Sequence, residues 1–182
     1  MEKEIEVLRE KMKILAEGCR NGSIDSSTCS PYIFDIVLAA AEVYKNTDIK
    51  LYAPLDNGEA MVCEESGKYF IPLYTCEESF CDEMNSYKEV TLKEVSSYAY
   101  DNQVNYDLLS NPDYCLDHGI SYPELMEYAQ NNLKYEGIIL DPGMDDRFAF
   151  EGWLLPALVF KGMGVDKFNL IDAETGETEH EF

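Results

Sequence analysis

The sequence predicts an α+β fold in which helices flank a mixed, largely antiparallel sheet, with an N-terminal helical extension and a C-terminal hairpin. In the first twenty residues, apolar side chains recur every three or four positions, which is typical of an amphipathic helix. From Ile49 onward, short apolar runs alternate with turn residues, which indicates strands. We therefore expect three parts: a helical extension over 1–47, an α+β domain over 48–162 with an insertion at 96–122, and a hairpin or tail over 163–182.

The N-terminal segment is predicted to be a helix with one narrow apolar stripe and a stop at Gly18. The stripe consists of four residues: Ile5, Leu8, Met12 and Leu15. Two interpretations of the stripe remain open. It packs the helix onto its own domain, or it forms a self-association or partner surface, because it resembles a short coiled-coil seam. A second, buried helix is expected over 32–44, after a linker-like stretch.

Four strands are expected in the first half of the body, over 49–55, 59–64, 69–74 and 87–95. Glu65-Ser66-Gly67-Lys68 has the composition of a hairpin turn between the second and third strands. Pro72 predicts an edge strand or a bulge, because proline cannot donate to a strand ladder. Thr75 and Glu78 have the spacing of a capping box, which predicts a helix that buries Phe80 and Met84.

The second half of the body is expected to begin with an irregular insertion at 96–122, followed by a helix from a capping box at Ser121. The apolar run Ile138–Leu140 predicts a fully buried strand, and the chain after Asp141-Pro142-Gly143 is expected to return antiparallel to it. A helix is expected to begin or kink at Pro156. The tail over 168–182 then forms a hairpin around a Glu-Thr-Gly-Glu turn.

The charge of the chain excludes several classes of partner. With 14 Lys and Arg against 36 Asp and Glu, the formal net charge is −22. Such a chain is not expected to bind nucleic acid or an anionic membrane, both of which require basic side chains. The charge is uneven: residues 1–20 carry five basic and five acidic side chains, whereas residues 51–182 carry seven basic and 27 acidic ones. The acidic surface therefore belongs to the main body.

The expected location is the cytoplasm. The charged start of the chain does not have the apolar core of a secretory signal, and the longest uncharged apolar run, 152–160, is far shorter than the ~20 residues of a membrane helix. Six cysteines are expected to be free thiols in a reducing compartment. They are Cys19, Cys29, Cys63, Cys76, Cys81 and Cys115.

Two places in the sequence are candidates for chemistry. The turn that carries Asp141, Asp145 and Asp146 is a candidate binding site, because three carboxylates in six residues suit a Ca²⁺ or Mg²⁺ ion. Cys115 and His118 form a single C-x2-H pair, one half of a zinc-site spacing. Asp and Gly are also ordinary turn residues, and a catalytic triad is rarely built from sequence neighbours. We therefore assign no catalytic or metal residue and expect no cofactor.

The run from Leu51 to about Lys161 resembles the SseB N-terminal domain family. Four features carry the resemblance in order: Leu51-Tyr52-Ala53-Pro54-Leu55, the segment Lys68–Glu78 with Pro72 and Thr75, a valine-rich strand, and Gly137-Ile138-Ile139-Leu140-Asp141-Pro142. In the last of these, Asp141 stands where the family usually has Asn. The resemblance implies a compact α+β domain of bacterial type. It implies no reaction, cofactor or catalytic residue.

The function expected from the sequence is that of a non-enzymatic protein-interaction or regulatory module. Its acidic body is expected to engage a basic or polar protein surface, with association that weakens as salt rises. Self-association through the N-terminal helix is the other expected contact. The alternative is a small-molecule-binding or metal-binding enzyme that uses the Cys115–His118 insertion or the Asp141–Asp146 turn.

Overall fold

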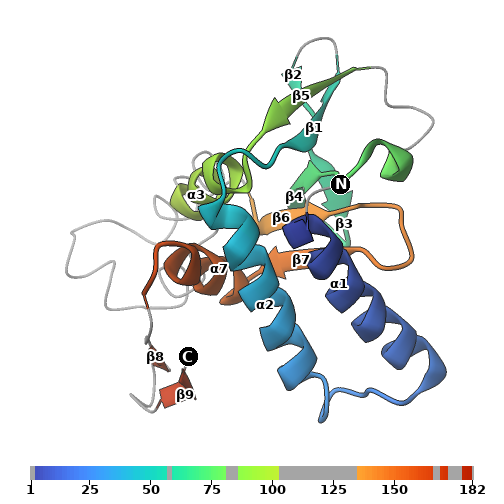
Figure 1. Ribbon diagram of the computed structural model, residues 1–182, viewed down its shortest axis with the longest axis vertical. Helices are drawn as coiled ribbons and strands as arrows, with labels where there is room; N and C mark the ends of the chain where they lie inside the picture. The colour runs from blue at the N-terminus through green and yellow to red at the C-terminus, as the bar shows by residue number, and fades with distance from the viewer. Residues whose placement is uncertain are drawn as a thin grey trace.

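The computed structural model describes residues 3–56, 59–80, 86–102, 135–165, 169–171 and 178–181. Among these residues, two helices come first, followed by strands, further helices and a hairpin (Figure 1). The α+β class predicted from the sequence is confirmed, as is the C-terminal antiparallel pair. The order is α1 (Lys3–Asn21), α2 (Ser30–Lys45), β1 (Leu51–Asp56), β2 (Glu59–Ala60), β3 (Cys63–Glu65), β4 (Lys68–Leu73), the 3₁₀ turn η1 (Glu77–Ser79), β5 (Ser86–Val90), α3 (Leu92–Asp101), β6 (Gly137–Leu140), β7 (Phe148–Glu151), α7 (Leu154–Gly162), β8 (Asn169–Ile171) and β9 (Thr178–Glu181).

The strands of the body form two small sheets that meet at one bridge. The first has the order β2-β1-β5 and the second the order β3-β4-β6-β7, and backbone bonds of 2.9 Å between Tyr52 and Tyr74 join them. Among the described strands only β4 and β6 pair in parallel, so the sheet is mixed and largely antiparallel, as predicted. The segment expected as one strand over 59–64 is instead split, because the chain leaves β1 after Ala60 and joins β4 at Cys63.

The hairpin between β3 and β4 is built by its turn residues, as expected. Ser66 and Gly67 have φ angles of 56° and 79°, the left-handed conformation that a two-residue hairpin turn requires. Pro72 behaves differently from the prediction, because β4 is an interior strand. Its pairing with β3 stops at Phe70, and its bridge to β1 begins only at Tyr74. The missing N–H of Pro72 therefore falls in the gap between two partners.

The hydrophobic core lies between the sheet and the helices. Ile138, Leu140 and Phe150 of the second sheet belong to this core, in which β6 contacts α3 and β7 contacts α7. Ile5, Leu8 and Met12 of α1 belong to the same cluster. The two N-terminal helices are thus part of the main core rather than an appendage, and α1 continues through Gly18 to Asn21.

Helix α3 begins where the sequence predicted the end of a strand. The strand expected over 87–95 ends at Val90, and Thr91 caps α3. The Thr91 hydroxyl accepts a bond of 3.1 Å from the Glu94 amide, and the Glu94 carboxylate accepts one of 2.9 Å from the Thr91 amide. The expected insertion at 96–122 therefore begins inside a helix. Its remainder from residue 103, the capping box at Ser121, Cys115 and His118 lie outside the described residues.

The capping box makes the stability of the fold depend on pH. The backbone and side-chain hydrogen bonds from Thr91 lower the pKa of Glu94. A carboxyl group with a lowered folded-state pKa stabilises the fold above its unfolded value of about 4.3, and this contribution is lost as pH falls through the folded-state value. We expect the wild type to be more stable than Glu94→Gln near neutral pH and this advantage to vanish in acid. The measurement is urea unfolding of both proteins from neutral to acid pH. A difference in the free energy of unfolding that stays constant with pH would contradict the role given to the Glu94 carboxylate.

Candidate functional site

Asp141 is a structural residue in the interior rather than an open ligand. Its side chain is 2% exposed. Oδ1 accepts a 2.8 Å hydrogen bond from the Thr75 amide, and Oδ2 accepts a 2.6 Å bond from the Thr75 hydroxyl. The Ser79 hydroxyl lies 2.7 Å from Oδ1. Asp141 therefore ties the end of β6 to the segment that follows β4.

This arrangement explains why the helix predicted after Thr75 is reduced to the turn η1. The Thr75 hydroxyl, expected to cap a helix, is occupied by Asp141. Cys76 takes the N-cap position of η1 without a side-chain cap bond. Cys76 is also buried, and its sulfur accepts a 3.2 Å hydrogen bond from Arg9 Nη1, which connects α1 to the same cluster. Phe80 follows η1, and Met84 lies outside the described residues.

The three carboxylates proposed as a binding turn do not converge. Asp141 faces the interior, whereas Asp145 is 89% exposed and lies 3.5 Å from Arg20 of α1. Asp146 is half-buried in the same loop. Within the described part of the chain, no group of three His, Cys, Asp or Glu side chains is placed to hold a metal ion. The geometry therefore gives no support to an ion at this turn.

The apolar stripe of α1 is buried in the chain's own core. Ile5, Leu8 and Met12 are no more than 2% exposed, and Leu15 is half-buried against the same cluster. This position corresponds to the first of the two interpretations, a helix packed on its own domain. A contact between two copies cannot use Ile5, Leu8 or Met12 while α1 is in place.

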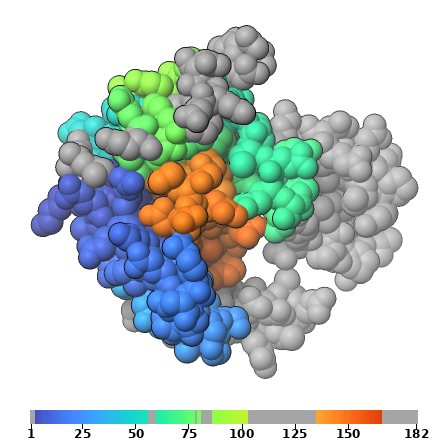
Figure 2. Space-filling model, turned by 90° about the vertical axis from the view of Figure 1, so that its right-hand side faces the viewer, coloured from blue at the N-terminus to red at the C-terminus, as the bar shows by residue number. Residues whose placement is uncertain are grey.

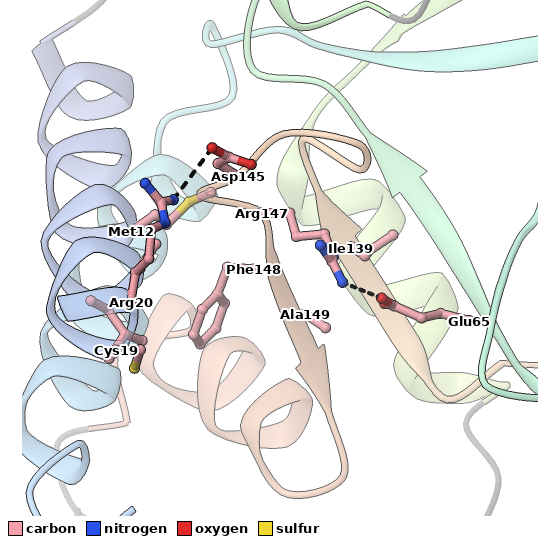
Figure 3. A pocket seen from close by; sticks show the side chains of 11 residues that line it. Met12, Cys19, Arg20, Glu65, Ile139, Asp145, Arg147, Phe148 and Ala149 are labelled. Atoms are coloured by element: carbon pink, nitrogen blue, oxygen red, sulfur yellow. Dashed lines mark hydrogen bonds and ion pairs between the residues drawn. The ribbon is translucent and has the colours of Figure 1, made fainter. Parts of the chain in front are cut away.

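A hollow of about 370 Å³ lies between α1 and the β6–β7 hairpin. Phe148 projects from β7 towards α1, and Met12 lies on the side of α1 (Figure 3). Leu15 also lines the hollow from α1. The surface view shows α1 beside the β6–β7 connection (Figure 2). Two of the chain's three arginines line this hollow. Arg20 pairs with Asp145 at 3.5 Å and Arg147 with Glu65 at 2.5 Å.

The charges that line this hollow are balanced. Each guanidinium already lies against a carboxylate, so the two arginines and two acids leave no net charge among these four groups. Ile139, Phe148 and Ala149 add apolar lining. The arrangement suits an uncharged apolar group better than an ion, because an anionic ligand would have to compete with the paired carboxylates.

A second surface, on β1 and β5, combines aromatic rings with carboxylates. Tyr52 opposes Glu89 and Pro54 opposes Tyr87 in the β1–β5 register, so these four side chains share one face of the ribbon. Phe80 packs onto this face, and the ring centroids of Tyr52, Phe80 and Tyr87 lie within 5.3 Å of one another. We call this the aromatic–carboxylate face; it consists of Tyr52, Glu77, Phe80, Tyr87 and Glu89.

The electrostatics of this face are those of an acidic surface. Burial raises the pKa of Tyr52, and the negative charges of Glu77 and Glu89 raise it further, because they oppose a phenolate. Tyr87 is 43% exposed, and Glu77 and Glu89 are exposed beside it. Aromatic rings next to carboxylates are the groups that bind ammonium and guanidinium side chains. Sequence reasoning missed this face, although the two-residue spacing of Tyr87 and Glu89 on one strand is a signal for it.

Comparisons with known proteins leave the site to be interpreted from its own chemistry. No protein-family model, no curated protein and no solved structure matches this chain. In the described residues, no helix is both long enough and apolar enough to cross a membrane.

Proposed function

We propose that the chain is a non-enzymatic interaction module that docks a basic segment of a protein partner on the aromatic–carboxylate face. The observation that carries the proposal is the placement of an exposed tyrosine ring, Tyr87, among aromatic neighbours and the carboxylates of Glu77 and Glu89. The rings offer cation–π contact to a guanidinium, and the carboxylates offer its counter-charge. A net charge of −22 also steers a basic partner towards the molecule.

The resemblance to the SseB N-terminal domain family is part of this proposal. Residues from its separate motifs lie together here: Pro72 is in register with Ile139, and Thr75 bonds to Asp141. This neighbourhood supports one structural unit formed by the motifs. Because the resemblance implies no reaction, it agrees with a binding role. The expected cytoplasmic, bacterial-type setting stays a prediction.

The test uses a synthetic arginine–glycine peptide as the probe, with fluorescence anisotropy at low and high salt. We expect Tyr87→Ala to weaken binding about two- to fivefold, because an exposed cation–π contact is worth about 0.5–1 kcal/mol. Glu89→Gln is also expected to weaken it. Binding is expected to fall as salt rises, because the attraction is between exposed charges.

Two matched controls separate a specific face from general attraction to an acidic chain. Tyr98→Ala removes a tyrosine that is 51% exposed on α3, and Glu64→Gln removes an exposed carboxylate on β3. Both controls are expected to bind the peptide like the wild type. Equal losses in the controls and the face variants, or no loss in either, would refute the aromatic–carboxylate face as the docking site.

A further inference from the structure

A third surface lies on the outer side of the N-terminal helices. It crosses α2 and is flanked by α1 and the end of α7, and Figure 1 shows α2 between the other two helices. The surface is a shallow hollow of about 480 Å³. We call it the α1–α2–α7 face; its lining includes Val7, Lys11, Asp35, Leu38, Glu42, Lys45, Lys161 and Val165.

Apolar side chains gather on this face. Val7, Leu38 and Val165, one from each of its three segments, are 38%, 40% and 38% exposed. Ile14, which is 41% exposed, follows Val7 by seven residues and so lies on the same side of α1. Single exposed apolar residues are normal on a protein surface, whereas several gathered in one hollow are typical of an interface.

The charge of this face differs from that of the rest of the molecule. Helices α1 and α2 carry six basic and six acidic side chains, so the whole net charge of −22 comes from other residues. The hollow itself holds three lysines and two carboxylates. Two of the lysines are already in ion pairs of 2.7 Å, Lys11 with Asp35 and Lys45 with Glu42.

From this distribution we infer that the α1–α2–α7 face binds a second copy of the chain in a two-fold dimer. On this face the lysines and carboxylates nearly balance within each copy, so two copies that meet about a two-fold axis bring no large charge of one sign together at the contact. Contact between two acidic bodies is opposed by repulsion. The neutral helices are therefore where two such molecules approach at least electrostatic cost. This inference does not depend on the proposed docking of a basic partner.

The dependence on salt distinguishes the two kinds of association. Binding of a basic partner weakens as salt rises, because salt screens an attraction. Dimerisation of a chain with a charge of −22 strengthens as salt rises, because salt screens the repulsion between the bodies. The same buffer series thus gives opposite trends for the two contacts.

The experiment is sedimentation equilibrium of the full chain over a wide concentration range at low and high salt. We expect a monomer–dimer equilibrium whose dissociation constant falls as salt rises. Leu38→Glu is expected to raise that constant tenfold or more, as is common for a charge placed at the centre of an interface. Leu38→Lys, which lowers the net negative charge, is also expected to raise it, because the apolar contact is lost.

The matched control is Val62→Glu. Val62 is 45% exposed between β2 and β3, so the substitution adds the same charge at a similar exposure outside the face. It is expected to leave the dissociation constant within about twofold of the wild type, with folding of each variant checked by circular dichroism. A monomer at every concentration and salt, a Leu38→Glu protein that dimerises like the wild type, or equal losses in Val62→Glu and Leu38→Glu would overturn the inference.

Discussion

Replacing Asp141 by alanine is expected to lower the free energy of unfolding by about 3–5 kcal/mol. The substitution removes the only carboxylate that accepts the bonds from the Thr75 amide and the Thr75 hydroxyl in the described structure. Both donors are buried, and a buried donor left without its charged acceptor is costly. Ser79 is affected less, because its hydroxyl also lies 2.7 Å from the Cys76 carbonyl.

The backbone conformation of Asp141 is a second reason why Asp141→Ala is expected to destabilise the fold. Asp141 has a φ of 48°, a left-handed conformation that Asp and Asn adopt more readily than alanine does. We therefore expect Asp141→Asn to cost about 1 kcal/mol, because its Oδ1 still accepts the Thr75 amide while the Thr75 hydroxyl turns to accept from the new amide group.

Asp145→Ala is the matched control for this prediction. It removes a carboxylate from the same loop, but Asp145 is 89% exposed and its pair with Arg20 spans 3.5 Å. An exposed ion pair contributes little, so the change is expected to stay within about 0.5 kcal/mol of the wild type. Urea unfolding followed by circular dichroism gives all three values. Similar losses in Asp141→Ala and Asp145→Ala would show that the buried hydrogen bonds are not the cause.

Replacing Gly137 by alanine is expected to lower the free energy of unfolding by about 3 kcal/mol or more. Gly137 opens β6 and lies opposite Glu151, where a Cβ atom would overlap the carbonyl oxygen of Phe150. This obstacle is backbone of β7, so relief requires that the two strands move apart. Such a movement would disturb Ile138 and Phe150, which are both fully buried in the core.

The control for Gly137 is Gly18→Ala in α1. A Cβ atom there also meets a neighbour, but the neighbour is the side chain of Ile24, from Cδ1 to Cβ, rather than backbone, and a side chain can change its rotamer. Alanine also favours the helix by about 1 kcal/mol relative to glycine. Gly18→Ala is therefore expected to change the stability by less than about 1 kcal/mol. If Gly137→Ala unfolds in urea like the wild type, the close approach of β6 and β7 is not required by the fold.

The two surfaces proposed for binding differ in what they offer. The aromatic–carboxylate face presents rings and acids, whereas the α1–α2–α7 face presents apolar side chains and balanced charge. The predicted stripe of Ile5, Leu8 and Met12 forms no part of either surface, because these side chains are buried where α1 packs on the core. Self-association through the N-terminal helices therefore stays a proposal, and the residues proposed for it are those of the α1–α2–α7 face.

Several elements could be predicted because their causes are local. The stripe of α1, the positive φ angles of the Ser66–Gly67 turn and the apolar run of β6 each follow from residues that are neighbours in sequence. The capping boxes show where local reasoning fails. Thr75 and Thr91 are each followed three residues later by Glu, yet only Thr91 caps a helix in the described structure. Thr75 bonds instead to Asp141, 66 residues away.

The local pattern thus determined the class of fold, the helical stripe and the acidic body with its neutral first helix. Tertiary structure alone decided the roles of single residues. It placed Pro72 between two strand partners, turned Asp141 inward while Asp145 faces solvent, and brought Tyr52, Phe80 and Tyr87 onto one face. The physical reason is that periodicity and turn chemistry act over a few residues, whereas the partner of a hydrogen bond or a ring is chosen by the packing of segments far apart in the chain.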